Sequence, residues 1–143
     1  MKRNVVVTGG KGFIGYNLCN YLSEYYNVIS IDNFNLRQIF KKKKFYKDYN
    51  FSIGNKKKTE KIIKKYRPIF IFNLAAESHV DNSIKNPSKI IKNNIGETYN
   101  FIQVILDNTF FLGKDFKFIH LSTDEVYGDI KKNSNKIFKE NSN

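Results

Sequence analysis

A strand, a glycine-rich turn and a helix follow one another directly at the start of this chain. Residues 5–8 (VVVT) form a β-branched run, which favours a strand. The turn GGKGFIG occupies residues 9–15, and an apolar pattern with helical spacing begins inside it. This succession is typical of a dinucleotide-binding βαβ unit. It predicts that Gly9 permits the tight turn, that Gly12 leaves room for a pyrophosphate, and that Gly15 lets the helix pack closely.

A second predicted strand, residues 28–31 (VISI), ends at Asp32. This aspartate follows Gly15 by about 17 residues, near the ~20 expected for the acid that binds the adenosine ribose. A carboxylate there accepts hydrogen bonds from both ribose hydroxyls and repels a 2′-phosphate, so it predicts NAD rather than NADP as the cofactor. The alternatives are a turn that binds no ligand, for the glycines alone, and a strand-end turn residue, for Asp32 alone.

The composition indicates one globular domain. A chain of 143 residues can bury a core, and no apolar run reaches the ~18 residues that span a bilayer. The N-terminus lacks the apolar segment of a signal peptide, and the single cysteine, Cys19, has no partner for a disulfide. We therefore expect a soluble, cytoplasmic protein that has no membrane partner.

The net charge of +12 raises the question of nucleic-acid binding. Only three of the 25 basic residues are arginine, however, and lysine, asparagine, isoleucine, phenylalanine and tyrosine are all abundant. These residue types have A- and T-rich codons, so genome drift explains the whole set. The lysine runs at 41–44 and 56–58 are then solvated faces, and we expect no nucleic-acid partner beyond weak, salt-sensitive binding to polyanions. No metal site is expected either.

The rest of the chain alternates strands with helices. Residues 33–49 are polar and basic and predict at most an irregular helix. The side chains that follow the expected strand at 69–74 are small enough to leave room for a ligand. The first helix is expected to bury Phe13, Ile14, Leu18, Tyr21, Leu22 and Tyr25. The expected helices cover residues 12–25, 59–66 (capped by Thr59 and ended by Pro68) and 88–110, and the later strands cover 50–53, 69–74 and 116–121.

Five strands separated by helices predict an α/β fold with a doubly wound parallel sheet. The expected strand order is 3-2-1-4-5, as in a Rossmann domain. The cofactor would lie across the carboxyl edge of this sheet, at the crossover between the first and fourth strands.

Three short motifs together resemble the extended short-chain dehydrogenase/reductase family. They are TGGKGFIG at residues 8–15, LAA at 74–76 and VYG at 126–128. Two longer stretches, LAAESHVD at 74–81 and STDEVYGD at 122–129, are similar to the dTDP-glucose 4,6-dehydratases of that family. The adjacent acidic pair in the second stretch favours a dehydratase, because the related nucleotide-sugar epimerases generally lack it.

The resemblance implies a reaction and roles for individual residues. The C4 hydroxyl of dTDP-glucose is oxidised by NAD, water leaves across C5 and C6, and the hydride returns to C6, giving dTDP-4-keto-6-deoxyglucose for deoxysugar and surface-polysaccharide synthesis. Asp124 would be the acid toward the C6 hydroxyl and Glu125 the base toward the C5 proton. Thr123 would bind the sugar near O4, and Ser78 would line the same pocket. For the acidic pair by itself, an exposed turn is the alternative.

The implied cofactor site extends over the turn and the strand ends. Its residues are Gly9, Gly12, Phe13, Ile14, Gly15, Asp32, Asn33, Phe34, Asn35, Asn55, Lys56, Leu74, Ala75, Ala76, Glu77, Ser78 and Asn93. Asn55 and Asn93 depart from the family pattern, which has an aspartate and a threonine there. The Asn55 carbonyl can still accept a hydrogen bond from the adenine amine, but without charge. His79 and His120 are expected to be structural, and His120 belongs to a buried strand pattern.

The family's active-site Tyr-x-x-x-Lys is expected about 30 residues beyond Thr123, past residue 143. Tyr127 and Lys131 fit the spacing, but Gly128 between them disfavours a helix. We therefore expect residues 1–143 to form an incomplete NAD-binding Rossmann domain, truncated after the fifth strand, without a sugar-nucleotide domain and inactive alone. The alternatives are a non-catalytic NAD-binding remnant and a nucleotide-sugar epimerase. A homodimer or a complementing C-terminal chain would be its protein partner.

Overall fold

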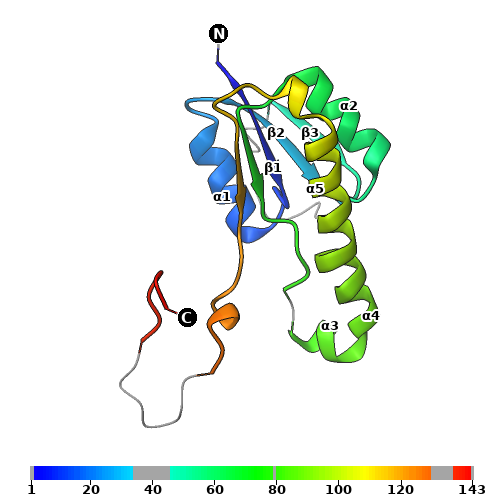
Figure 1. The fold of residues 1–143 in the computed structure, drawn as a ribbon, viewed down its shortest axis with the longest axis vertical. Coiled ribbons are helices and arrows are strands. Elements are labelled where there is room, and N and C mark those ends of the chain that lie inside the picture. The colour runs from blue at the N-terminus through cyan, green and yellow to red at the C-terminus, as the bar shows by residue number, and fades with distance from the viewer. Residues whose placement is uncertain (1, 34–45, 79, 130–136, 143) are drawn as a thin grey trace.

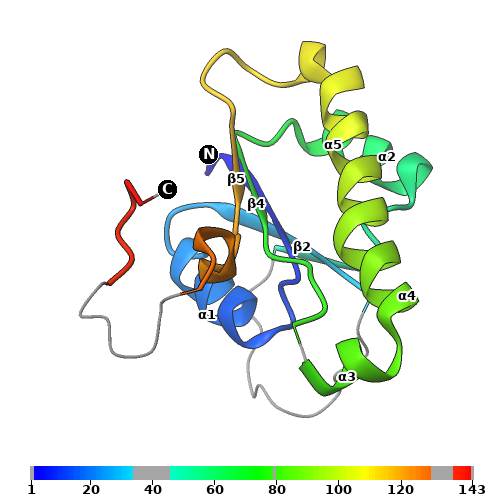
Figure 2. The ribbon, with the colours of Figure 1, turned by 60° about the horizontal axis from the view of Figure 1, so that its bottom comes forward.

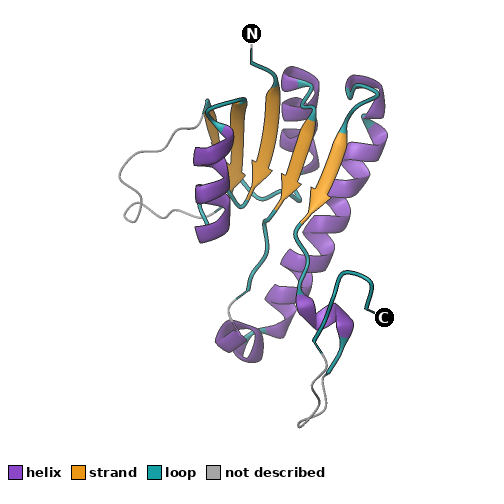
Figure 3. Cartoon of the chain, turned by 90° about the vertical axis from the view of Figure 1, so that its left-hand side faces the viewer, coloured by secondary structure: helices purple, strands orange, loops and turns teal. Residues whose placement is uncertain are grey.

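The structure is a computed structural model that describes residues 2–33, 46–78, 80–129 and 137–142. Its five strands form one sheet in the order β3-β2-β1-β4-β5, which confirms the predicted topology. All four strand pairs are parallel, so the carboxyl ends of the strands share one edge (Figure 3). The strands are β1 (Asn4–Thr8), β2 (Asn27–Asp32), β3 (Lys47–Asn50), β4 (Phe70–Asn73) and β5 (Lys117–His120).

Helices cover both faces of the sheet (Figure 1). Helix α1 (Phe13–Leu22) lies on one face, and α2 (Lys56–Tyr66) and α5 (Thr98–Asp107) lie on the other. Strand β1 serves both cores because its side chains alternate: Val5 and Val7 face α1, whereas Val6 faces α2 and α5. Burial on both faces explains why the strand is a continuous valine run.

The predicted buried face of α1 is wrong in part, and the helix ends at Leu22 rather than at residue 25. Its buried residues are Gly15, Cys19 and Leu22, which recur at helical spacing. Two of the three are small, so the helix lies close to the sheet and the large side chains stay outside. The residues that were expected in the core but are exposed are Phe13, Ile14, Tyr21 and Tyr25.

Strand β3 lies earlier than predicted, at Lys47–Asn50 instead of 50–53. Ile53 is buried in the core against α2 and α5, but it reaches that core from the turn after the strand. The apolar pattern therefore identified Ile53 correctly as a buried residue, but it placed the strand too late in the sequence. Helix α2 begins at Lys56 with Asn55 as its N-cap, so Thr59 is not the cap; its hydroxyl donates to the carbonyl of Ile53 at 3.1 Å.

The long helix predicted over 88–110 is instead a run of joined segments. Helix α4 (Pro87–Ile90) continues into a π-helical turn (Ile91–Glu97) and then into α5, and a 3₁₀ turn follows at Thr109–Phe111. A short helix, α3 (Val80–Lys85), precedes this run. Figures 1 and 2 show α3 and α4 beyond the carboxyl edge of the sheet.

Three further observations concern exposed residues and the length of the helices. His120 is exposed, contrary to its expected burial, because β5 is an edge strand of the described sheet. Among the described residues, no helix is long and apolar enough to cross a membrane. Lys56 to Lys58 are exposed on the first turn of α2, whereas residues 41–44 lie outside the described part of the chain.

Candidate functional site

The glycine turn joins β1 to α1 at the carboxyl edge of the sheet. Gly9 has φ +68°, and a Cβ there would lie 2.8 Å from the carbonyl oxygen of Leu74, so only glycine fits. The N–H of Gly12 donates to the carbonyl oxygen of Gly9 at 3.0 Å and closes the turn. Gly15 packs so tightly on this turn that a Cβ would lie 2.1 Å from the same oxygen. Gly12 is the N-cap of α1, and no side chain caps this helix end.

Asp32 ends β2 beside the turn and is buried. Its Oδ2 accepts a hydrogen bond from the N–H of Lys11 at 2.9 Å. The Lys11 side chain is also buried, and its Nζ lies 3.3 Å from Oδ2 of Asp48 on β3. Sequence reasoning missed the pairing of Lys11 with Asp48 because no local spacing connects a turn with a strand 37 residues later.

A buried hydroxyl connects the ends of β1 and β4. Thr8 Oγ1 accepts from the N–H groups of Leu74 and Ala75, both at 3.1 Å, and donates to Oδ1 of Asn73 at 2.6 Å. The amide nitrogen of Asn73 lies 3.0 Å from Nδ1 of His120 on β5. Thr8 and Asn73 are completely buried, so this network fixes where the chain leaves β4.

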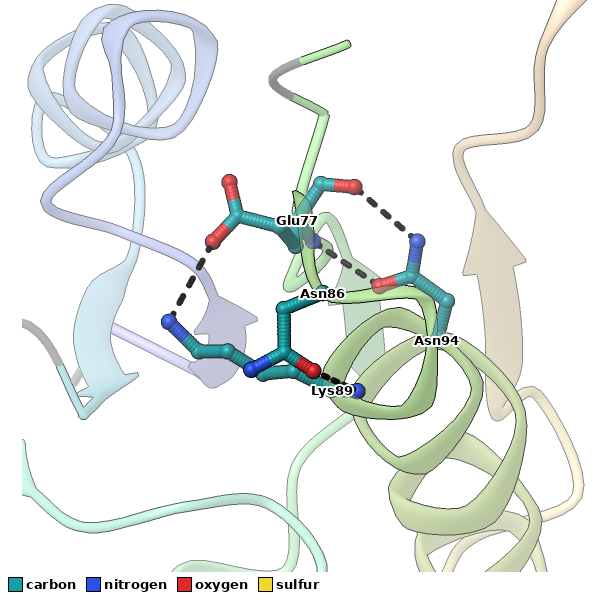
Figure 4. A network of polar contacts seen from close by, with 4 residues as sticks. All are labelled: Glu77, Asn86, Lys89 and Asn94. Carbon is teal, nitrogen blue, oxygen red and sulfur yellow. Dashed lines mark hydrogen bonds and ion pairs between the residues drawn. The ribbon is translucent and has the colours of Figure 1, made fainter. Parts of the chain in front are cut away.

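The loop after β4 is held by the π-helical turn (Figure 4). The side chain of Asn94 accepts from the N–H of Glu77 at 2.8 Å and donates to the carbonyl oxygen of Glu77 at 3.0 Å. The Glu77 carboxylate lies 3.8 Å from Nζ of Lys89, whose own N–H donates to the side chain of Asn86. Asn94 is therefore a positioning residue of the loop that the sequence analysis did not single out. Its neighbour Asn93, which was predicted for the cofactor, is half-buried.

The turn before α2 packs against the same π-helical segment. The hydroxyl of Ser52 hydrogen-bonds the Glu97 carboxylate, and a Cβ at Gly54 would lie 2.9 Å from the Glu97 side chain. The side chain of Asn55 accepts from the N–H of Lys58 at 3.1 Å. The predicted adenine contact of Asn55 would thus have to share a carbonyl oxygen that already caps α2.

The segment after β5 carries the predicted catalytic residues. Thr123 caps a 3₁₀ turn (Asp124–Tyr127), accepting from the N–H of Glu125 at 3.3 Å. Thr123 and Glu125 are exposed. The ring of Tyr127 stacks on Phe138 with centroids 5.2 Å apart, and Gly128 has φ +78°. The backbone therefore leaves helical geometry directly after Tyr127, and Lys131 lies outside the described residues.

The remaining predicted residues lie around this edge with different exposure. Leu74, Ala75 and Glu77 are half-buried. The exposed residues are Phe13, Ile14, Asn33, Lys56, Ala76 and Ser78. Phe34, Asn35 and His79 lie outside the described residues. The structure thus brings the turn, Asp32 and the start of the β4 loop into direct contact, and Thr123 and Glu125 follow β5 at the same edge of the sheet.

Cys19 lies on α1 under the turn and gives a chemical test of this packing. Burial, with the nearby Asp48 and Asp32 carboxylates, raises the pKa of its thiol from 9.0 to about 12. A thiol that keeps its proton longer when folded stabilises the fold fully below pH 9, and this contribution is lost as the pH rises toward about 12.

We expect the Cys19 thiol to react with a disulfide reagent at pH 8 at least ~100-fold more slowly in the folded protein than in urea, because only the exposed thiolate attacks. The release of thionitrobenzoate measures both rates. A folded rate within about tenfold of the unfolded rate would contradict the buried position of the thiol.

The parallel sheet in the order 3-2-1-4-5, with a glycine turn between β1 and α1, defines a protein of the Rossmann type. The chain belongs to the GDP-mannose 4,6 dehydratase family, whose profile matches residues 6–142. This membership and the relatives below confirm the family resemblance of the motifs.

Curated relatives are dTDP-glucose 4,6-dehydratases. The Haemophilus influenzae protein is 36% identical over 140 residues, which cover 89% of this chain and 41% of that protein. The Salmonella typhimurium protein is 36% identical over 139 residues, which cover 88% and 38%. The chain therefore spans about two fifths of the length of the curated relatives it matches.

Two enzymes whose structures have been solved share the fold of this chain. UDP-glucose 4-epimerase from Thermotoga maritima is 32% identical with a TM-score of 0.74, covering 90% of this chain and 41% of that one. The dTDP-glucose 4,6-dehydratase from Bacillus anthracis, solved in complex with NAD, is 27% identical with a TM-score of 0.72, covering 96% and 43%.

Proposed function

We propose that this chain binds NAD at the carboxyl edge of its sheet. The observation that carries the proposal is the amino end of α1, where Gly12 caps the helix without a side chain, whereas Asn55 and Asn86 cap α2 and α4. The first N–H groups of a helix lack partners within it and carry partial positive charge, which suits a diphosphate. A Cβ at Gly12 would meet only the Gly9 carbonyl oxygen, at 3.3 Å, so the backbone there can be approached closely.

The residues at the ends of β2 and β4, beside the turn, fit the adenosine half of NAD. Asp32 would accept hydrogen bonds from the ribose hydroxyls, and the small side chains of Ala75 and Ala76 leave space at the end of β4. The NAD complex of the B. anthracis dehydratase supports this cofactor. NAD supplies a hydride acceptor, and the residues of this chain hold and orient it.

For the whole protein we propose the 4,6-dehydration of dTDP-glucose, which the similarity to dTDP-glucose 4,6-dehydratases supports. In this proposal the Thr123 hydroxyl binds the sugar near O4, and Ser78 lines the sugar pocket from the β4 loop. Asp124 donates a proton to the departing C6 hydroxyl, and Glu125 removes the proton from C5, so that one water leaves. Both carboxylates act only after the C4 hydroxyl has been oxidised.

That oxidation needs a base for the C4 hydroxyl, which the family resemblance assigns to a Tyr-x-x-x-Lys pair. Tyr127 and Lys131 are the only residues of the 143 with this spacing, and Tyr127 ends a 3₁₀ turn that stops at Gly128, which has φ +78°. We therefore propose that residues 1–143 do not turn over dTDP-glucose by themselves. The partner that completes the enzyme would be a chain that supplies the part of the relatives' length that residues 1–143 do not cover, or a second copy of this chain.

Calorimetry with NAD and an assay with dTDP-glucose test the two parts separately. We expect NAD to bind to the folded chain with no 4-keto-6-deoxy sugar formed, and Asp32→Ala to weaken NAD binding by about tenfold or more because charge-assisted hydrogen bonds to the ribose are lost. Asp107→Asn on α5, remote from the turn, is the control and should bind as the original. A folded chain that shows no NAD binding would overturn the proposed function.

The Thermotoga epimerase, at 32% identity and a TM-score of 0.74, favours a second candidate, the inversion of a nucleotide sugar at C4. It predicts an intact sugar with inverted configuration instead of a dehydrated one. The adjacent Asp124 and Glu125 favour dehydration, because loss of water needs a separate acid and base. Product analysis of the completed enzyme distinguishes the two.

A further inference from the structure

The one charged residue of the glycine turn GGKGFIG is Lys11, and it is buried. Its side chain is 7% exposed, and its ammonium pairs with the Asp48 carboxylate at 3.3 Å. Its main-chain N–H donates to Asp32 at 2.9 Å. One lysine therefore connects the turn to the carboxyl end of β2 through its main chain and to β3 through its side chain.

Both carboxylates lie on the face of the sheet that α1 covers. Asp48 is paired with Ser30 in the register of β2 and β3, and Asp32 lies two residues further along β2 on the same face. The turn approaches this face closely, because a Cβ at Gly10 would lie 2.5 Å from the Ser30 hydroxyl. Among the described residues, two carboxylates and one ammonium come together on this face beside the turn, and their formal charges sum to −1.

We propose that the ion pair between Lys11 and Asp48 makes this end of the site reject the 2′-phosphate of NADP. The inference rests on the NAD binding proposed above and adds a second specificity element to Asp32. Asp48 pairs with the Lys11 ammonium on the sheet, so the one cation of the turn already has a carboxylate partner. The carboxylate of Asp32 then repels the phosphate, and an ammonium that could offset this repulsion is occupied.

Removing the Asp48 carboxylate should release the lysine. Binding of NAD and of NADP is measured by calorimetry, at one low salt concentration, for the original chain, Asp48→Asn, and Lys11→Gln combined with Asp48→Asn. We expect NADP affinity to rise by about tenfold or more in Asp48→Asn, because an ammonium–phosphate hydrogen bond forms, with NAD affinity changed less than ~3-fold. The double variant should lose the gain.

Asp107→Asn on α5 is the charge-matched control, because it changes the net charge equally without touching the turn. It should leave both affinities unchanged, which separates release of Lys11 from a general gain in positive charge. Asp48 is 32% exposed on an edge strand, so asparagine should be tolerated. If circular dichroism shows that this variant is unfolded, Asp48→Thr, a good strand former, is measured instead.

The two proposals fail in different ways. If the original chain binds neither dinucleotide, the proposed function is wrong. If it binds NAD but Asp48→Asn gains no NADP affinity, or if the original chain binds NADP as tightly as NAD, only the role of the ion pair is wrong. A gain that persists in the double variant would also overturn it, because Lys11 would not be its source.

Discussion

Replacing Gly15 with alanine is expected to destabilise the fold by at least ~3 kcal/mol and to abolish NAD binding with it. The added Cβ would lie 2.1 Å from the carbonyl oxygen of Gly9 and 2.9 Å from Cα of Gly10. The three nearest atoms are all main chain, so no rotamer change relieves the overlap with them. The turn cannot yield either, because Gly9 is backed by the carbonyl of Leu74. Relief requires α1 to move off the sheet, which opens the core around Cys19.

Urea denaturation followed by circular dichroism measures the loss, and Gly96→Ala provides the matched control. Gly96 also lies in a helical segment, but a Cβ there would lie 4.0 Å from the carbonyl oxygen of Ile91, an ordinary van der Waals distance. Alanine at Gly96 should be neutral or stabilising by up to ~1 kcal/mol, because it lowers the entropy of the unfolded chain. Equal effects of the two substitutions would mean that α1 does not rest on the turn as the structure shows.

The topology could be predicted because it follows from signals within single elements. Strands β1, β2, β4 and β5 each carry an apolar run of their own, and the glycine turn fixes how β1 passes into α1. The right-handed crossover rule then leaves few arrangements of five parallel strands. The same local logic failed at β3, where Phe51 and Ile53 resemble strand residues but lie in the turn after it. Ile53 is buried by α2 and α5, which a window of neighbouring residues does not contain.

The site could be predicted only as far as its motifs reach. The turn, Asp32 and the β4 loop are motif residues, and the structure brings them together. The contacts that hold them, Lys11 with Asp48 and Asn94 with Glu77, join segments that pattern reasoning treats separately. Helix α1 shows the opposite error: apolar Phe13 and Ile14 were assigned to the core, but its inner face needed small residues because the turn lies so close.

Thr8→Val should cost about 3 kcal/mol or more, although valine has nearly the same shape as threonine. The hydroxyl of Thr8 makes three hydrogen bonds, and the residue is completely buried. Valine would leave the N–H of Ala75 and the side-chain oxygen of Asn73 without this partner, while the N–H of Leu74 keeps a weaker bond to the Thr8 carbonyl at 3.3 Å. Desolvated polar groups that lose a partner each cost ~1–3 kcal/mol.

Thr8→Ser is the complementary substitution, because it keeps the hydroxyl and removes one methyl group. We expect it to lower the free energy of unfolding by about 1 kcal/mol. Urea denaturation of both variants tests the order of their effects, and amide exchange at Leu74 and Ala75 tests its cause. In Thr8→Val, the amide of Ala75 should lose more protection against hydrogen exchange than the amides of β1 do. If serine proved the more damaging of the two, the methyl packing of Thr8 would matter more than its hydroxyl. The exit of the chain from β4, on which both the turn and the loop depend, would then be set by van der Waals contact.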